Sequence, residues 1–159
     1  LGHGLSVAVG MALGLKMDKK EFRVFTLLGD GELSEGSIWE AATTASKYQL
    51  DNLIVIVDRN KLQITGNTEE VNPLEPLADK FLSFGFSISE TLGNDISSLM
   101  EILQKTPSEK NKPNLIIANT VKGAGVSFIE NQIAWHHKVP SETEYNMAMK
   151  ELDEALLNV

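Results

Sequence analysis

Oxygen-bearing side chains follow two apolar runs of this sequence, at positions where they could hold a metal ion. Gly29-Asp30-Gly31 comes directly after one run, and Asn60 lies three residues past the end of another. Mg²⁺ is a hard cation that takes about six oxygen ligands, usually a few from protein and the rest from phosphate and water. One carboxylate, one amide oxygen and a backbone carbonyl would therefore leave room for the oxygens of a diphosphate.

The two glycines beside Asp30 add a second feature. They let the backbone approach a phosphate closely and direct N–H groups at it, near the start of a predicted helix. Taken alone, Gly29-Asp30-Gly31 is more typical of a tight turn leading into a helix, because Asp-Gly is a common turn pair. The combination with Asn60 favours a cation and diphosphate site.

The elements that position these residues are predicted from short apolar runs. The predicted strands are Phe22–Leu28, Leu53–Val57 and Leu115–Ala118, with a weaker candidate at Phe86–Ser89. The first three are nearly continuous in their hydrophobicity, which is typical of parallel strands with both faces buried. Ligands of open parallel sheets bind beyond the carboxyl ends of the strands, where both polar segments would lie.

Helical patterns lie between and after the strands. The predicted helices are Leu5–Met17, Ser37–Tyr48, Pro76–Phe84, Ile96–Leu103 and Ser141–Leu157. Ser34 or Ser37 is expected to cap the second helix. The alternation of strand and helix predicts an α/β fold class, a parallel sheet with helices on both faces. No internal repeat or low-complexity segment divides the chain, so residues 1–159 are expected to form a single domain.

Composition narrows the class of function. The chain has 14 Lys and Arg against 22 Asp and Glu, and a net charge of −8 disfavours nucleic-acid binding. The absence of cysteine excludes disulfides, thiolate metal sites and a cysteine nucleophile. The most apolar stretch, Leu5–Leu15, is shorter than the ~20 residues of a membrane helix, so no membrane association is expected. We expect a cytoplasmic protein, although the first residue is Leu1 rather than Met.

Four segments together resemble the transketolases, which use thiamine diphosphate. Gly29-Asp30-Gly31 followed by Asp58-Arg59-Asn60 is similar to the thiamine-diphosphate motif, and Gly-Asp-Gly-Glu-Leu-Ser-Glu-Gly is similar to its transketolase version. The other similar segments, in the family's order and over nearly the whole chain, are Leu1–Ala12, Asn60–Gly66 and Lys122–Lys138. The resemblance is closest to the separate N-terminal subunits of split bacterial and archaeal transketolases.

This resemblance implies the thiamine-diphosphate-binding fold, with thiamine diphosphate and Mg²⁺ or Ca²⁺ as cofactors. Asp30 and Asn60 would ligate the metal through side-chain oxygens, and Leu62 through its carbonyl. Ile64 would pack near the thiazolium ring, and Glu32 is expected to be solvated. The residues that the resemblance implies for cofactor binding are Gly2, His3, Gly4, Gly29, Asp30, Gly31, Glu32, Asn60, Leu62 and Ile64.

The resemblance also implies two catalytic residues. Glu35 matches a family glutamate at the dimer contact that belongs to a proton relay, although an acid is also favoured at any helix N-terminus. His136 matches a histidine that contacts the donor sugar, and imidazole titrates in the right pH range for proton transfer. His137 stands where the family often has glycine, so the assignment between the two histidines stays open. Lys122 could compensate the negative charge of a phosphate or lie in water.

The implied reaction transfers a two-carbon ketol unit from a ketose phosphate to an aldose phosphate, as in the pentose phosphate pathway. The family glutamate that activates the cofactor belongs to a pyrimidine-binding domain, for which 159 residues leave no room. We therefore expect the partner to be a C-terminal transketolase subunit, in a dimer or heterotetramer. Family elements that help bind substrate would precede Leu1, and the chain alone is expected to have no turnover.

Three alternatives remain open at this point. A 1-deoxyxylulose-5-phosphate synthase or the α subunit of a 2-oxo acid dehydrogenase would share the diphosphate and metal site. A phospho-receiver module could use Asp30, Asp58 and Lys122, although such modules need paired acids after the first strand. A non-catalytic scaffold could keep the same fold.

Overall fold

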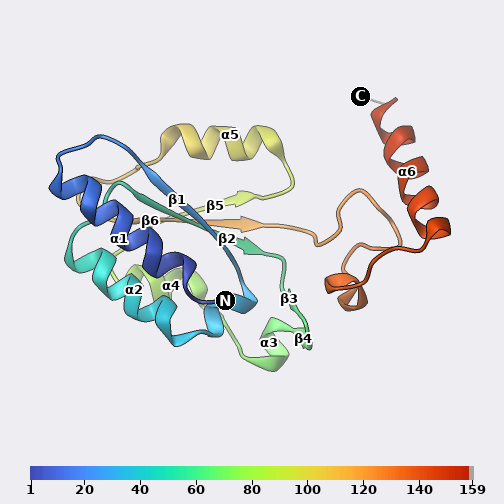
Figure 1. Ribbon diagram of the computed structural model, residues 1–159, viewed down its shortest axis with the longest axis horizontal. Helices are drawn as coiled ribbons and strands as arrows, with labels where there is room; N and C mark the ends of the chain where they lie inside the picture. Colours follow the sequence, from blue (N-terminus) through green and yellow to red (C-terminus); the bar gives the residue numbers. More distant parts are fainter. Residues whose placement is uncertain (158–159) are drawn as a thin grey trace.

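Four parallel strands form a single sheet at the centre of the computed structural model, which describes residues 1–157. The order across the sheet is β1 (Val24–Gly29), β2 (Leu53–Arg59), β6 (Asn114–Asn119) and β5 (Ser87–Leu92) (Figure 1). The predicted parallel sheet is thus confirmed, including its weakest strand. Because all neighbours are parallel, their carboxyl ends lie along one edge.

The register of the sheet aligns the loops at that edge. Gly29 pairs with Asp58, and Asp58 pairs with Ala118. The chain leaves β1 at Asp30 and leaves β2 at Asn60, so the two predicted metal ligands begin neighbouring loops.

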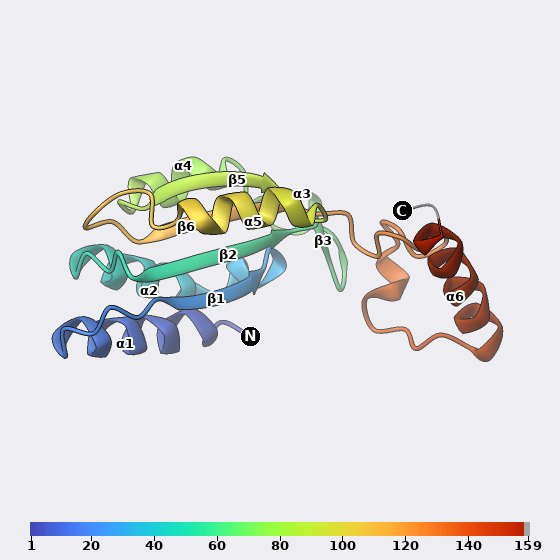
Figure 2. The same cartoon turned by 90° about the horizontal axis from the view of Figure 1, so that it is seen from above.

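The predicted helices are confirmed with end shifts of a few residues. Helices α1 (Gly4–Met17), α2 (Gly36–Lys47) and α4 (Leu77–Ser83) cover one face of the sheet (Figure 1). Helix α5 (Ile96–Lys105) lies on the opposite face, as the second view also shows (Figure 2).

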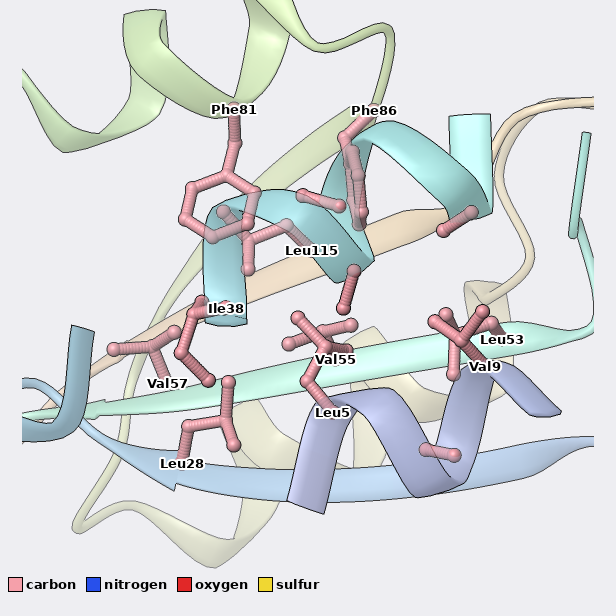
Figure 3. Close-up of a cluster of buried hydrophobic side chains, with 14 of the residues drawn as sticks. Leu5, Val9, Leu28, Ile38, Leu53, Val55, Val57, Phe81, Phe86 and Leu115 are labelled. Carbon is pink, nitrogen blue, oxygen red and sulfur yellow. The ribbon is translucent and has the colours of Figure 1, made fainter. Parts of the chain in front are cut away.

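The core lies between the sheet and the three-helix layer. Leu5 of α1 and Ile38 of α2 are fully buried against strand residues such as Val55 (Figure 3). Phe81 of α4 makes an edge contact with Phe86, with ring centroids 5.2 Å apart. Full burial of such side chains is worth about 1.5–3 kcal/mol each, which anchors the helices on this face.

The opposite face of β1 corrects one prediction. Phe25 and Leu27 are 47% and 69% exposed, so β1 is not buried on both faces within residues 1–157. The reason is the position of β1 at the sheet edge, since α5 packs against β5 on the other side. Continuous hydrophobicity therefore indicated a parallel strand correctly but not how completely it is covered.

Short elements that the sequence did not predict surround the carboxyl edge. β3 (Leu62–Gln63) and β4 (Gly66–Asn67) form an antiparallel hairpin after β2, and α3 (Thr68–Val71) follows directly. Two 3₁₀ turns cover Gly31–Ser34 and Ile133–His136.

The last helix, α6 (Glu142–Leu156), lies beyond the carboxyl ends of the strands and apart from the sheet (Figures 1 and 2). Ser141 and Glu144 form a capping box at its start, and Glu151 accepts hydrogen bonds from the backbone and hydroxyl of Ser127. No helix within residues 1–157 combines the length and apolarity needed to span a bilayer.

Candidate functional site

A cavity of about 430 Å³ opens at the carboxyl edge of the sheet. This volume is in the range of small-molecule sites. It lies where the loops after β1 and β2 meet the hairpin and the 3₁₀ turn Ile133–His136. The predicted site residues that line it are Gly29, Asp30, Gly31, Glu32, Asn60, Leu62, Ile64 and His136.

Asp30 is held in place by three donors. Its carboxylate is only 1% exposed. Oδ1 accepts a hydrogen bond from the backbone N–H of Gly31 at 2.8 Å, while Oδ2 accepts from Lys61 N–H at 2.6 Å and from Arg59 Nη1 at 2.9 Å. The β1 loop is therefore tied through this carboxylate to the end of β2.

Asn60 is also buried, and both ends of its amide are engaged. Oδ1 accepts from the backbone N–H of Leu62 at 3.0 Å, and Nδ2 donates to Asp58 Oδ2 at 3.2 Å. Asp58 in turn accepts a hydrogen bond from the hydroxyl of Thr120, which follows β6. These contacts orient the Asn60 amide from two sides at the cavity wall.

The donor chemistry fits a hard cation. Within residues 1–157, no three His, Cys, Asp or Glu side chains are grouped as a metal site. The predicted set instead consists of the Asp30 carboxylate, the Asn60 amide oxygen and the Leu62 carbonyl. Oxygen ligands of this kind suit Mg²⁺ or Ca²⁺, with the remaining positions left to phosphate and water.

Two glycines are required by close approaches around the cavity. A Cβ added to Gly31 would lie 2.9 Å from Cβ of Gln63, so the hairpin could not sit as close beside any other residue. Gly2 has a φ of +80°, and a Cβ there would lie 2.8 Å from Cβ of Glu35. Both glycine positions therefore bring separate chain segments together.

The structure changes the expectation for Glu32 and Gly2. Glu32 was expected to be solvated, but it is half-buried and accepts a 2.8 Å hydrogen bond from the N–H of Gly2. The expectation was wrong because the N-terminal segment passes over the 3₁₀ turn that carries Glu32. The N–H groups of Gly2 and Gly31, two residues that the resemblance assigns to cofactor binding, thus donate to Glu32 and Asp30.

The expected serine cap of α2 is also absent. Glu35 occupies the N-cap position, and its side chain makes no cap hydrogen bond in the described part of the chain. Ser37 instead donates from its hydroxyl to the carbonyl of Gly2 at 2.7 Å. The serine therefore holds the N-terminal segment rather than the end of the helix.

His136 is the histidine that reaches the cavity. Its Nδ1 is buried and has no hydrogen-bond partner among residues 1–157. Burial lowers the pKa of His136, and the positive charges of Lys122 and His137 lower it further, against an opposite effect of Asp30. His137 is exposed, with its ring centroid 4.8 Å from that of His136.

Other predicted residues lie outside the cavity lining. His3 is exposed and occupies the N-cap position of α1, whose first residue is Gly4. Glu35 is exposed at the start of α2, and Gly2 reaches the lining only through its bond to Glu32. The role of Glu35 at a subunit contact stays a prediction.

Two cationic residues belong to this region beyond the predicted set. Lys122, left open from the sequence, lines the cavity. Arg59 was given no role, yet it is a buried partner of Asp30. Its signal in the sequence is a charged residue two positions after an apolar strand run, because a charged group near a buried strand is rarely buried without a partner.

Comparison with known proteins agrees with this architecture. Residues 1–153 match the family described as transketolase, thiamine diphosphate binding domain. An apulose-4-phosphate transketolase subunit of Phocaeicola vulgatus is 46% identical over 156 residues, which cover 98% of this chain and 56% of that protein. The 6-deoxy-6-sulfo-D-fructose transketolase subunit SqwG of Clostridium sp. is 42% identical over 153 residues, covering 96% of this chain and 56% of that one.

A solved structure extends the similarity to three dimensions. The transketolase from Campylobacter jejuni superposes with a TM-score of 0.80 at 25% identity, over 99% of this chain and 30% of that chain. This chain spans just over half the length of the two relatives named above. Since the family match runs through residues 1–153, the chain belongs to the transketolase family, in the part described as its thiamine diphosphate binding domain.

Proposed function

We propose that this chain is the N-terminal subunit of a two-subunit transketolase and binds thiamine diphosphate through Mg²⁺ or Ca²⁺. The observation that carries the proposal is the convergence of Asp30 and Asn60 on one cavity at the carboxyl edge of the sheet. These two side chains and the Leu62 carbonyl would hold the cation. Gly29 and Gly31 would let the backbone lie close to the diphosphate.

The remaining lining residues suit the other parts of the cofactor. Ile64 is 55% exposed at the cavity, so its aliphatic side chain is available to cover an apolar ring. Lys122 brings a positive charge that would oppose phosphate. Because Gly31 N–H is engaged by Asp30, and Gly2 N–H by Glu32, a diphosphate would have to compete with these carboxylates for the two donors.

Thiamine diphosphate, when bound, supplies a nucleophilic carbon and an electron sink for cleaving the carbon–carbon bond beside a ketose carbonyl. The protein contributes orientation and proton transfer. Burial and the charge of Lys122 favour the neutral form of His136 by lowering its pKa, and a neutral imidazole that lines the cavity could exchange a proton with a substrate hydroxyl. Glu35 would act at a subunit contact, because it lies exposed at the start of α2.

The proposed reaction moves a two-carbon ketol unit from a ketose phosphate to an aldose phosphate in the cytoplasm. Both relatives are named as single subunits of transketolases, which supports a partner that carries the pyrimidine-binding domain, in a dimer or heterotetramer. The two relatives act, by their names, on apulose-4-phosphate and on 6-deoxy-6-sulfo-D-fructose, which are both anionic sugars. An anionic ketose is therefore the substrate class we propose here.

Calorimetry with thiamine diphosphate and MgCl₂ tests the binding step. The unaltered chain should release binding heat that depends on the cation, while Asp30→Asn and Asn60→Ala should lose most of it. Equal heats in all three proteins would contradict the proposed cation site and would favour a non-catalytic scaffold.

Ketol transfer tests the reaction. We expect turnover of xylulose 5-phosphate only when the chain is combined with a C-terminal transketolase subunit. Turnover of pyruvate instead would favour a 1-deoxyxylulose-5-phosphate synthase or a 2-oxo acid dehydrogenase subunit. The phospho-receiver alternative loses support, since the chain belongs to another family and Asp58 is bonded to Asn60 and Thr120.

A further inference from the structure

Arg59 is a buried guanidinium at the end of β2, directly before Asn60. Its side chain is 2% exposed. Nη1 donates to Asp30 Oδ2 at 2.9 Å and to the hydroxyl of Thr68 at 2.8 Å. Nη2 donates to Glu69 at 2.7 Å and to Glu75 at 2.9 Å, and Nε lies 3.3 Å from the same Glu75 oxygen. One cation therefore joins three carboxylates.

These carboxylates come from three separate segments. Asp30 follows β1, Glu69 lies in α3, and Glu75 precedes α4. Glu75 also accepts from the backbone N–H of Leu77 at 2.9 Å, at the first residue of α4. The network thus connects the cavity wall to the layer of helices that covers the sheet.

The two carboxylate oxygens of Asp30 accept hydrogen bonds from different donors. Oδ2 accepts from both Arg59 and Lys61, which engages both of its lone pairs. Within residues 1–157, Oδ1 accepts only from the N–H of Gly31, which leaves its second lone pair for another partner. The planar fork of an arginine can hold several oxygens in fixed positions at once, which a lysine cannot do.

We propose that Arg59 is a positioning residue of the cation site, holding Oδ2 so that Oδ1 of Asp30 is the oxygen presented to a divalent cation. The inference rests on the proposed function. Partners that orient a ligand from behind commonly change metal affinity 10–100-fold when they are removed. Arg59 would act in this way without touching the cation.

The sign of the effect separates positioning from simple charge. Replacing Arg59 by a neutral residue makes the site more negative, so electrostatics alone would strengthen cation binding. Loss of positioning would weaken it. If Arg59 only stabilised the network as a whole, Glu75→Gln and the Arg59 variants would change the affinity for the cation alike.

The test is calorimetry of the full chain with MgCl₂ and thiamine diphosphate. We expect about 10-fold or weaker affinity in both Arg59→Gln and Arg59→Lys. Glu75→Gln leaves the pair of Arg59 and Asp30 intact and should change affinity less than about threefold, within ordinary surface effects. Arg23→Gln is the matched control, because Arg23 donates to the carbonyl of Thr106 outside the cavity lining.

Amide hydrogen exchange without ligand supplies a second readout. The Lys61 N–H, which is hydrogen-bonded to Asp30, should exchange about 10-fold faster in Arg59→Lys than in the unaltered chain. Its exchange rate should be unchanged in Arg23→Gln. Should Arg59→Gln fail to fold, Arg59→Lys carries both measurements.

The outcomes are distinct. Unchanged or tighter cation binding in folded Arg59 variants overturns the positioning role and leaves the proposed function standing. If the unaltered chain binds neither cation nor cofactor, the proposed function fails, and Lys61 exchange then decides whether Arg59 positions Asp30. Unchanged exchange in Arg59→Lys overturns the inference in that case as well.

Discussion

The carboxylate of Asp30 accepts a 2.6 Å hydrogen bond from the backbone N–H of Lys61, which joins the loops after β1 and β2 directly. Lys61 follows Asn60 and has a φ of +64°, so the backbone turns sharply at this contact. The contact places the two predicted metal ligands at one point of the sheet edge. The site is therefore formed by contacts within the chain, and each of these contacts can be tested separately.

Removing one partner of the buried ion pair between Arg59 and Asp30 should lower the free energy of unfolding. Arg59→Met leaves Asp30 buried with its guanidinium partner removed, and we expect a loss of about 3–5 kcal/mol in the free energy of unfolding. Asp30→Asn should cost about 1.5–3 kcal/mol, because Arg59 keeps Glu69 and Glu75. Urea unfolding of both variants and of the double variant measures the coupling. A double variant whose loss equals the sum of the single losses would show that the pair contributes no coupling.

Gly31→Ala should weaken cofactor binding by displacing the hairpin. The added Cβ would lie 2.9 Å from Cβ of Gln63, so β3 must move away from the cavity wall. We expect about a 10-fold loss of thiamine diphosphate affinity, as for other small displacements of a binding group. Gly10→Ala is the control, since among residues 1–157 no heavy atom beyond its chain neighbours and its own helix backbone lies within 4 Å of its Cβ position in α1. That helical substitution should raise stability by about 0.4–1 kcal/mol; equal affinity in both variants would contradict the steric argument.

His136 should titrate below its ordinary value of 6.5, because burial and the charge of Lys122 lower its pKa. The folded chain then binds fewer protons than the unfolded chain as the pH falls below 6.5. The stability that His136 contributes is therefore present above that pH and decreases below it. NMR titration of the imidazole measures the shift, and Lys122→Met should move the pKa of His136 upward. An unshifted His136 resonance would contradict its burial in the cavity wall.

The start of α6 should melt in acid. Hydrogen bonds from Lys138 and from the backbone and hydroxyl of Ser141 lower the pKa of Glu144 to about 2. Because the folded pKa is depressed, the contribution of Glu144 is complete above its ordinary value of 4.5 and is lost as the pH falls toward 2. Backbone chemical shifts of α6 between pH 5 and 2 should show this loss, as about one helical turn fraying. In Glu144→Gln the transition in this window should be absent.

Much of the fold could be predicted from local patterns. The runs at Leu53–Val57 and Leu115–Ala118 became central strands, and the pattern at Ser37–Tyr48 became helix α2. Such patterns are short-range, because the burial of a strand or helix face imposes its own periodicity on the sequence. The candidate metal ligands followed in the same way, since the ends of parallel strands must share an edge.

Packing between distant segments could not be predicted in this way. Whether β1 is covered depends on its place at the sheet edge, and the bond from Gly2 to Glu32 depends on where the N-terminal segment crosses the 3₁₀ turn. Neither of these two features produces a periodic pattern in the sequence.

The polar interior shows the same division most clearly. The residue types alone predicted that Asp30 and Asn60 could ligate a cation, because the presence of a ligating oxygen is a property of the side chain itself. That Arg59 would be buried against Asp30, Glu69 and Glu75 depended on three separate segments of the chain coming together. A charge is stable inside a protein only when its partners surround it, and only the folded chain can bring those partners together.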